Sequence, residues 1–183
     1  MKVGLIITTY NWTDALVKVL NSVKLQSYLP DEIVVCDDGS RIECKKYILE
    51  FQKLFPYPFK YLWNEDKGFR AAFIRNKGIL ELSDDIDYII LIDGDMILDK
   101  NFVKDHLKNS QKNYFIQGGR VLISKKRTND ILNQHSTTNK FNFFTSGLLN
   151  KKNTIYMPFL TKFFFIKTNQ NLDGIRTCNM SFW

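Results

Sequence analysis

The chain has 183 residues, of which 44% are hydrophobic and 25% are charged, and its net charge is +7. This composition is typical of one folded domain and excludes a disordered chain, and no apolar run approaches the roughly 18 residues of a membrane-spanning helix. The cysteines Cys36, Cys44 and Cys178 have no metal-ligand spacing and are odd in number, so we expect a reducing, cytoplasmic location rather than a disulfide framework.

The charge is divided unevenly along the chain. Residues 1–100 carry 13 Lys/Arg against 16 Asp/Glu, a net charge of −3, whereas residues 101–183 carry 13 against 3, a net charge of +10. The basic half suits an anionic partner such as a membrane surface, a phosphate or nucleic acid; solvated surface lysines are the alternative. Because no RNA-binding aromatic motif or helix-turn-helix signature accompanies the charge, we expect no nucleic-acid partner.

Strand and helix patterns alternate along the first hundred residues. Short β-branched runs predict strands, and apolar residues spaced three and four apart predict helices. The predicted strands are residues 3–8, 32–36, 60–63 and 88–92. The predicted helices are residues 13–23, 43–55 and 71–82. This alternation predicts an α/β fold, with a mostly parallel sheet and helices on both faces.

The patterns weaken in the second half, where a small antiparallel or loop-rich region is expected. Residues 101–109 predict a short helix, and residues 115–123 a strand interrupted by two glycines. The polar residues 124–153 are interpreted as a long loop. The remaining predicted strands are residues 155–159, 162–167 and 178–183. The two histidines, His106 and His135, are expected on the surface and in the loop, respectively.

Three polar clusters follow the predicted strands: T-T-Y-N at residues 8–11, D-D-G-S at 37–40 and D-G-D at 93–95. The carboxyl ends of parallel strands meet at one edge of a sheet, so we expect these clusters to share a crevice. Asp93 and Asp95 there suit a hard divalent cation shared with substrate phosphates. A solvated acidic turn is the alternative for these two residues alone.

The ordered motifs T-T-Y-N, D-D-G-S, G-x-R…R-N-x-G and D-G-D resemble those of the family-two glycosyltransferases with the GT-A fold. Residues 177–183, T-C-N-M-S-F-W, resemble the branch that includes bacterial chondroitin-type polymerases and galactosyltransferase-like domains. The resemblance covers residues 1–100 and 177–183, and residues 124–170 match no part of it. It implies a single domain, 1–183, with a nucleotide-binding half and an incomplete acceptor-side half divided at residue 100.

The resemblance also implies a reaction. A UDP-sugar donor would transfer its sugar with inversion to a saccharide or lipid-linked acceptor in bacterial surface polysaccharide synthesis, assisted by Mn²⁺ or Mg²⁺. A nucleotidyltransferase would also use acidic metal ligands, but T-T-Y-N lacks the glycines of its phosphate loop. Contact with the inner face of the membrane is suggested by the basic, aromatic residues 140–167, for which a hairpin that buries phenylalanines is the alternative.

Donor-binding roles are carried over from the resemblance. Thr8 and Tyr10 match positions that pack against the base, and Asp38 matches the carboxylate that accepts the uracil N3–H. Arg70 matches a basic residue near the base or diphosphate. A guanidinium fork suits phosphate oxygens. Taken alone, Tyr10 also fits a residue at the sheet rim.

The remaining matches concern the strand-end aspartates and their neighbour. Arg75 matches the arginine that faces the donor, with a surface salt bridge to Glu81 as the alternative. Asp93 matches the ribose-side carboxylate and Asp95 the direct metal ligand, and Gly94 leaves room between them for the nucleotide.

No catalytic residue is assigned, because the general base of this family follows the C-N-M-S-F-W segment and the sequence stops at Trp183. Asp173 precedes that place and is interpreted as a turn residue. The chain therefore looks truncated, and a non-catalytic nucleotide-sugar-binding remnant is the alternative to an active enzyme. Asn179 and Trp183 match positions on the acceptor side of the family's site.

Overall fold

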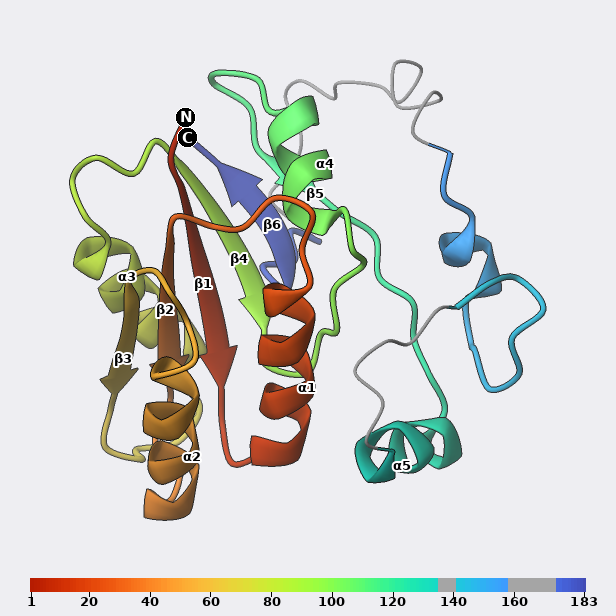
Figure 1. The fold of residues 1–183 in the computed structure, drawn as a ribbon, viewed down its shortest axis with the longest axis horizontal. Helices are drawn as coiled ribbons and strands as arrows, with labels where there is room; N and C mark the ends of the chain where they lie inside the picture. The colour runs from red at the N-terminus through yellow and green to blue at the C-terminus, as the bar shows by residue number, and fades with distance from the viewer. Residues whose placement is uncertain (135–140, 158–173) are drawn as a thin grey trace.

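The computed structural model describes residues 1–134, 141–157 and 174–183. Within these ranges one sheet has the strand order β3-β2-β1-β4-β6-β5 (Figure 1). Its strands are β1 (Val3–Thr9), β2 (Glu32–Asp37), β3 (Phe59–Trp63), β4 (Tyr88–Asp93), β5 (Ile116–Gln117) and β6 (Asn179–Phe182). The helices are α1 (Thr13–Lys24), α2 (Ile42–Gln52), α3 (Ala71–Glu81), α4 (Phe102–Asn109) and α5 (Lys125–Asn133), with a 3-10 turn η1 (Lys151–Thr154).

The sheet is mostly parallel, as predicted. β1 pairs in parallel with β2 and β4, and β2 with β3. β6 runs antiparallel to both β4 and β5. The carboxyl ends of β1, β2 and β4 therefore lie together at one edge of the sheet, and both chain termini lie at the opposite edge (Figure 1).

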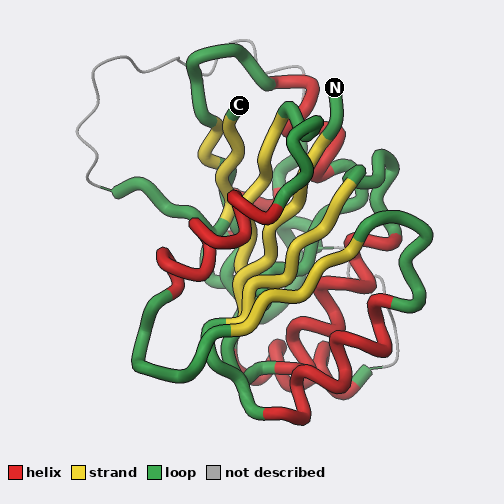
Figure 2. The backbone as a smooth tube through the Cα atoms, turned by 90° about the vertical axis from the view of Figure 1, so that its left-hand side faces the viewer, coloured by secondary structure: helices red, strands yellow, loops and turns green. Residues whose placement is uncertain are grey.

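Helices cover both faces of the sheet (Figure 2). The larger core lies under α1, α2 and α4, where alternate β1 residues such as Leu5 and Ile7 pack with Leu16 and Leu20. The smaller core lies under α3, where Ile74 packs on the other face. Alternation of side chains along a strand produces these two cores from the same segment. The predicted α/β class is confirmed.

The close approach of α3 to the sheet depends on a glycine. A Cβ atom at Gly78 would lie 2.4 Å from the Cys36 Sγ atom on β2. Ala72, the next residue after Ala71, is exposed. The buried positions of α3 are Ala71, Ile74 and Gly78.

Residues 124–153 are not the continuous loop that their composition predicts. α5 forms within them, capped by Ser124, whose Oγ accepts a hydrogen bond from the Arg127 N–H at 3.3 Å. Ile131 alone on this helix is buried. Its two apolar residues, Ile131 and Leu132, are adjacent and produce no helical periodicity, which explains why composition alone does not predict the helix.

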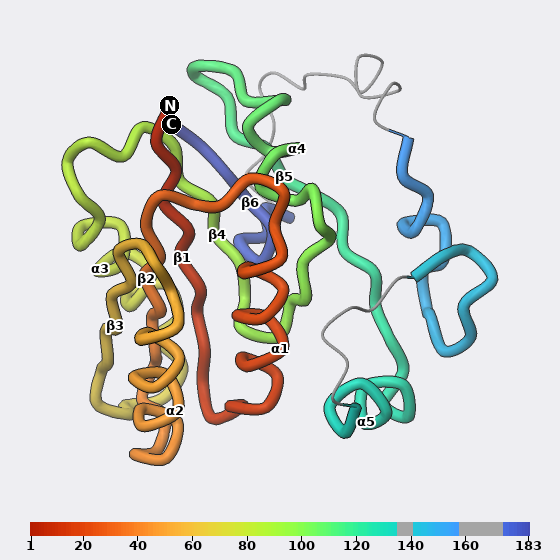
Figure 3. Tube along the Cα trace, viewed as in Figure 1, coloured from red at the N-terminus to blue at the C-terminus, as the bar shows by residue number. Residues whose placement is uncertain are grey.

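The second half departs from the core layers after β5. Figure 3 shows the chain running out to α5 and then to residues 141–157 at the side of the molecule. The predicted strand over residues 115–123 is reduced to the two-residue β5, and residues 155–157 form no strand. His135 and residues 158–167 lie outside the described residues. None of the helices in the described ranges is long and apolar enough to cross a membrane.

His106 is buried on α4, which corrects the prediction of a surface residue. Its Nε2 lies 2.9 Å from the Asn179 Oδ1, and the Asn179 Nδ2 donates to the Gly119 carbonyl at 2.7 Å. That amide orientation places the imidazole proton on Nε2, so Nδ1 accepts from the Ser181 hydroxyl at 2.6 Å. The Ser181 Oγ in turn accepts from the Tyr88 hydroxyl at 2.7 Å. This buried chain of hydrogen bonds joins α4, β4 and β6.

The network makes the stability of the fold sensitive to acid. Burial lowers the pKa of His106 to about 4, against about 6.5 in an unfolded chain. The unfolded chain therefore binds a proton first, so stability is complete above pH 6.5 and is lost as the pH falls toward 4. The difference between the two pKa values corresponds to a loss of about 3 kcal/mol in the free energy of unfolding. We expect urea unfolding to show that loss in the native protein.

His106→Gln isolates this histidine from other acid-sensitive groups, because glutamine supplies one donor and one acceptor but does not titrate. The difference in unfolding free energy between the two proteins should shrink as the pH falls from 7 to 4. Parallel stability curves for the two proteins would show that His106 does not cause the acid sensitivity.

Candidate functional site

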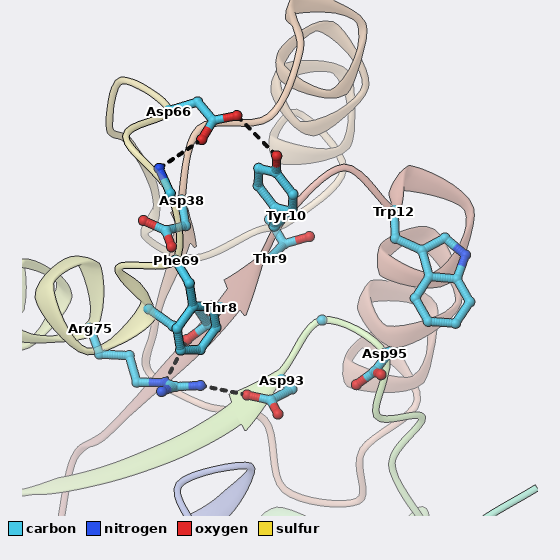
Figure 4. A pocket seen from close by; sticks show the side chains of 13 residues that line it. Thr8, Thr9, Tyr10, Trp12, Asp38, Asp66, Phe69, Arg75, Asp93 and Asp95 are labelled. Carbon is cyan, nitrogen blue, oxygen red and sulfur yellow. Dashed lines mark hydrogen bonds and ion pairs between the residues drawn. The ribbon is translucent and has the colours of Figure 1, made fainter.

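The three polar clusters converge on one pocket of about 400 Å³ at the carboxyl edge of the parallel strands (Figure 4). The strand register brings them together, because Thr8 pairs with Asp93 and Thr9 with Asp37. The pocket is lined by Thr8, Thr9, Tyr10, Trp12, Asp38, Asp66, Gly68, Phe69, Ala71, Arg75, Asp93, Gly94 and Asp95. Of the predicted donor and metal residues, all except Arg70 line it.

Tyr10 is held at one end of the pocket by a residue that sequence reasoning missed. Its hydroxyl donates to the Asp66 Oδ2 at 2.9 Å, and its ring remains half exposed. The Asp66 Oδ1 accepts from the Gly68 N–H at 3.2 Å, within a loop where Gly68 has a φ of +80°. The same loop packs closely on D-D-G-S, where a Cβ at Gly39 would lie 2.6 Å from the Asp66 Cα. The loop therefore holds the Tyr10 side chain in place, with its ring exposed to the pocket.

The two aspartates of D-D-G-S have different environments. Asp37 is fully buried, and its oxygens accept from the Ser40 N–H at 2.7 Å and the Tyr61 hydroxyl at 2.8 Å. Asp38 is also buried but lines the pocket, and its Oδ2 accepts from the Arg70 N–H at 2.7 Å. No described residue donates a hydrogen bond to the buried Oδ1 of Asp38. Buried acceptors are normally paired, so this oxygen is a candidate ligand contact.

Arg75 connects the ends of two strands from its place on α3. Its Nε donates to the Thr8 Oγ1 at 2.9 Å, and its Nη2 pairs with the Asp93 Oδ1 at 2.7 Å. These contacts contradict the alternative of a surface salt bridge with Glu81. The guanidinium faces the pocket and fixes the orientation of the Asp93 carboxylate (Figure 4).

Asp95 lies beyond this ion pair and remains exposed in the pocket. Loss of hydration raises the pKa of its carboxyl, and the negative charge of Asp93 raises the pKa further, while Arg120 opposes both effects. Gly94 between the aspartates packs on the end of β1, where a Cβ would lie 3.0 Å from the Thr8 carbonyl oxygen.

The donor set can be tested against a divalent cation. Within the described ranges, no three His, Cys, Asp or Glu residues form a metal-binding group. Asp93 and Asp95 supply only oxygen ligands and raise the local negative charge, which suits Mn²⁺ or Mg²⁺. Mg²⁺ typically takes one or two protein carboxylates and completes its shell with water and phosphate oxygens. The pair therefore fits a cation shared with a phosphate ligand.

Arg70 contributes its backbone rather than its side chain to the site. Its guanidinium donates to the Glu65 carbonyl and lies over the Phe73 ring, 5.5 Å from the ring centroid. Arg70 therefore does not line the pocket in this arrangement, and its predicted contact with the base or diphosphate stays a prediction. Two aromatic residues that line the pocket, Trp12 and Phe69, were not predicted.

The predicted acceptor-side residues do not reach the pocket. Asn179 is buried, and its amide is hydrogen-bonded to His106 and to the Gly119 carbonyl. Trp183 follows β6 and packs edge-on against Tyr88 at the start of β4, with a centroid distance of 5.4 Å. It lies at the opposite edge of the sheet because β6 is antiparallel to β4.

Comparisons with known proteins agree with this fold. The family model for Glycosyl transferase family 2 matches residues 5–174. The chain is 26% identical over 189 residues to the chondroitin synthase of Escherichia coli, which covers 98% of this chain and 26% of that protein. The chain thus spans about a quarter of the length of this relative.

Two solved structures share the fold at low identity. S. aureus TarS 1-349 in complex with UDP-GlcNAc has a TM-score of 0.51 and 23% identity, covering 59% of this chain and 30% of that one. The mannosyltransferase PcManGT from Pyrobaculum calidifontis, in complex with GDP-Man and Mn²⁺, has a TM-score of 0.55 and 16% identity, covering 72% and 38%. At these identities the likeness shows the GT-A fold.

Proposed function

Because this chain belongs to glycosyl transferase family 2, we propose that its pocket binds a UDP-sugar together with Mn²⁺ or Mg²⁺. The sugar would pass, with inversion at its anomeric carbon, to a saccharide or lipid-linked acceptor in the synthesis of a bacterial polysaccharide. The chondroitin synthase relative supports the polymer class of this proposal.

The buried Oδ1 of Asp38, which has no hydrogen-bond partner among the described residues, is the observation that favours a base with an N–H donor, such as uracil, over cytosine. An ionised carboxylate can only accept hydrogen bonds, and the Arg70 N–H already occupies its other oxygen. Uracil N3–H is a donor, whereas cytosine N3 is an acceptor. A uracil ring against Tyr10 would therefore satisfy an oxygen that is costly to leave unpaired.

The strand-end aspartates would hold the cation and the diphosphate. When bound, a divalent cation offsets the negative charge that develops on the departing diphosphate. Asp95 would supply a direct ligand, and Asp93 would remain oriented by Arg75 at 2.7 Å. Arg75 also places a positive charge beside this end of the pocket.

A donor-binding domain without transfer activity is the second candidate function. The four acidic residues that line the pocket, among those the structure describes, are Asp38, Asp66, Asp93 and Asp95. In the proposed arrangement they contact the base, Tyr10 or the cation, which leaves none of them to take the proton from an acceptor hydroxyl.

Calorimetric titration with UDP tests the donor proposal directly. We expect UDP to bind in the presence of Mn²⁺ and to bind far more weakly after EDTA treatment. Incubation with UDP-sugars and mass spectrometry of the products then separates the two candidates, since only an active enzyme releases or transfers the sugar. A protein that does not bind UDP with either Mn²⁺ or Mg²⁺ would contradict both.

A further inference from the structure

Trp12 is an exposed aromatic residue in the pocket that belongs neither to the proposed base site nor to the proposed cation site. Its side chain lines the same pocket as Asp95 and is 43% exposed. The ring belongs to neither hydrophobic core of the described residues. An exposed aromatic ring beside a few converging polar groups in a pocket is typical of a ligand contact.

The turn before α1 fixes the position of the backbone at Trp12. Asn11 has a φ of +47°, in the left-handed region that asparagine tolerates better than most residues. Its N–H donates to the Ser40 Oγ at 2.7 Å, and its Oδ1 accepts from the Arg41 N–H at 3.0 Å. Residues on both sides of the turn, Tyr10 and Trp12, line the pocket. The path of the backbone at Tyr10 and Trp12 is therefore held by hydrogen bonds between Asn11 and a second loop.

The two aromatic residues mark different parts of the pocket. Figure 4 shows Tyr10 with Asp66 and Asp38 in one part and Trp12 on the side of Asp95. A nucleotide whose base lies at Tyr10 and whose diphosphate reaches Asp95 would direct its sugar toward Trp12. The sugar would then occupy the Asp95 side of the pocket, where Trp12 lies (Figure 4).

We propose that Trp12 packs against the C–H face of the donor sugar and so selects for a pyranose with an exposed apolar face. The inference rests on the proposed function and deepens it. The negative face of an aromatic ring attracts the polarised C–H groups of a sugar, and the large indole offers the most contact area. The indole N–H adds a donor for a sugar hydroxyl.

Titration of Trp12→Ala with UDP, UDP-glucose, UDP-galactose and UDP-GlcNAc in Mn²⁺ tests this inference. Affinity for at least one UDP-sugar should fall roughly tenfold, which is about 1.4 kcal/mol, while affinity for UDP changes by less than about twofold. Trp12→Phe should keep most of the sugar affinity, because it retains an aromatic face.

Trp183→Ala is a matched control, since Trp183 is 42% exposed but lies at the opposite edge of the sheet. This control should bind all four ligands like the native protein. If Trp12→Ala weakens UDP and every UDP-sugar equally, or weakens none, the sugar contact is disproved while the donor site stands. If the native protein binds none of the four ligands, the donor site and the sugar contact both fall.

Discussion

Replacement of Asp95 by asparagine is expected to weaken Mn²⁺-dependent UDP binding by at least about 10-fold. Even groups that only orient metal ligands are worth about 10- to 100-fold in metal affinity, and a direct anionic ligand should be worth no less. The asparagine side chain would retain a carbonyl oxygen but lose the charge that attracts the cation. Titration of UDP in the presence of Mn²⁺, and again after EDTA treatment, measures the metal-dependent part.

The same substitution should leave the ligand-free fold as stable as before or make it more stable. Loss of hydration and the charge of Asp93 both raise the pKa of the Asp95 carboxyl, so its ionised form is disfavoured without a cation. Loss of binding with unchanged or raised thermal stability would separate a lost ligand from a damaged fold. Asp95 would then lower the stability of the ligand-free protein and contribute to binding only when the cation is present.

Asp84→Asn provides the charge-matched control. Asp84 is exposed and precedes β4, at the edge of the sheet opposite the pocket. This variant removes the same formal charge and should bind UDP and Mn²⁺ normally. If both variants bind normally, Asp95 is not a metal ligand and the assignment of this end of the pocket is wrong.

The sequence predicted the pocket because strand ends are local features whose meeting point is set by topology. Thr8, Asp38 and Asp95 each follow an apolar run, and a parallel sheet brings the ends of such runs to one edge. The order of strands did not need to be known for this inference. The pairing of β1 with both β2 and β4 then brings the three ends into one pocket.

Contacts between loops could not be predicted in the same way. The bond between Tyr10 and Asp66 joins residues 56 positions apart, and nothing in the periodicity of either segment specifies it. His106 was assigned to the surface for a similar reason, because its partners Asn179 and Ser181 come from a strand far along the chain. Trp12 carries a local signal, because it is an aromatic residue that directly follows a strand-end cluster.

Arg70 shows that a motif can indicate where the backbone of a residue lies without indicating how its side chain is oriented. The G-x-R pattern brings this residue to the pocket-forming loop, where its N–H binds Asp38. Its guanidinium is turned to the Glu65 carbonyl and the Phe73 ring. Sequence motifs define backbone position, whereas the rotamer of a long side chain depends on neighbours that the motif does not include.

Asp38→Asn is expected to change which base the pocket prefers, from uracil toward cytosine. The Arg70 N–H, 2.7 Å from one carboxylate oxygen, requires an acceptor there. Asparagine must place its only oxygen at that position, so its NH₂ group takes the place of the Oδ1 that has no partner among the described residues. A donor would then face the base where an acceptor faced it before.

The consequence differs in sign for the two bases. Uracil N3–H would meet another donor, and an unpaired buried group of this kind costs about 1–3 kcal/mol, or roughly 5- to 150-fold in affinity. Cytosine N3 would gain a donor and bind better than it does to native Asp38. Titrations of both proteins with UDP and CDP in Mn²⁺ should therefore show opposite changes. Equal losses for UDP and CDP would mean that Asp38 supports the loop without reading the base, and unchanged affinities would place the base elsewhere in the pocket.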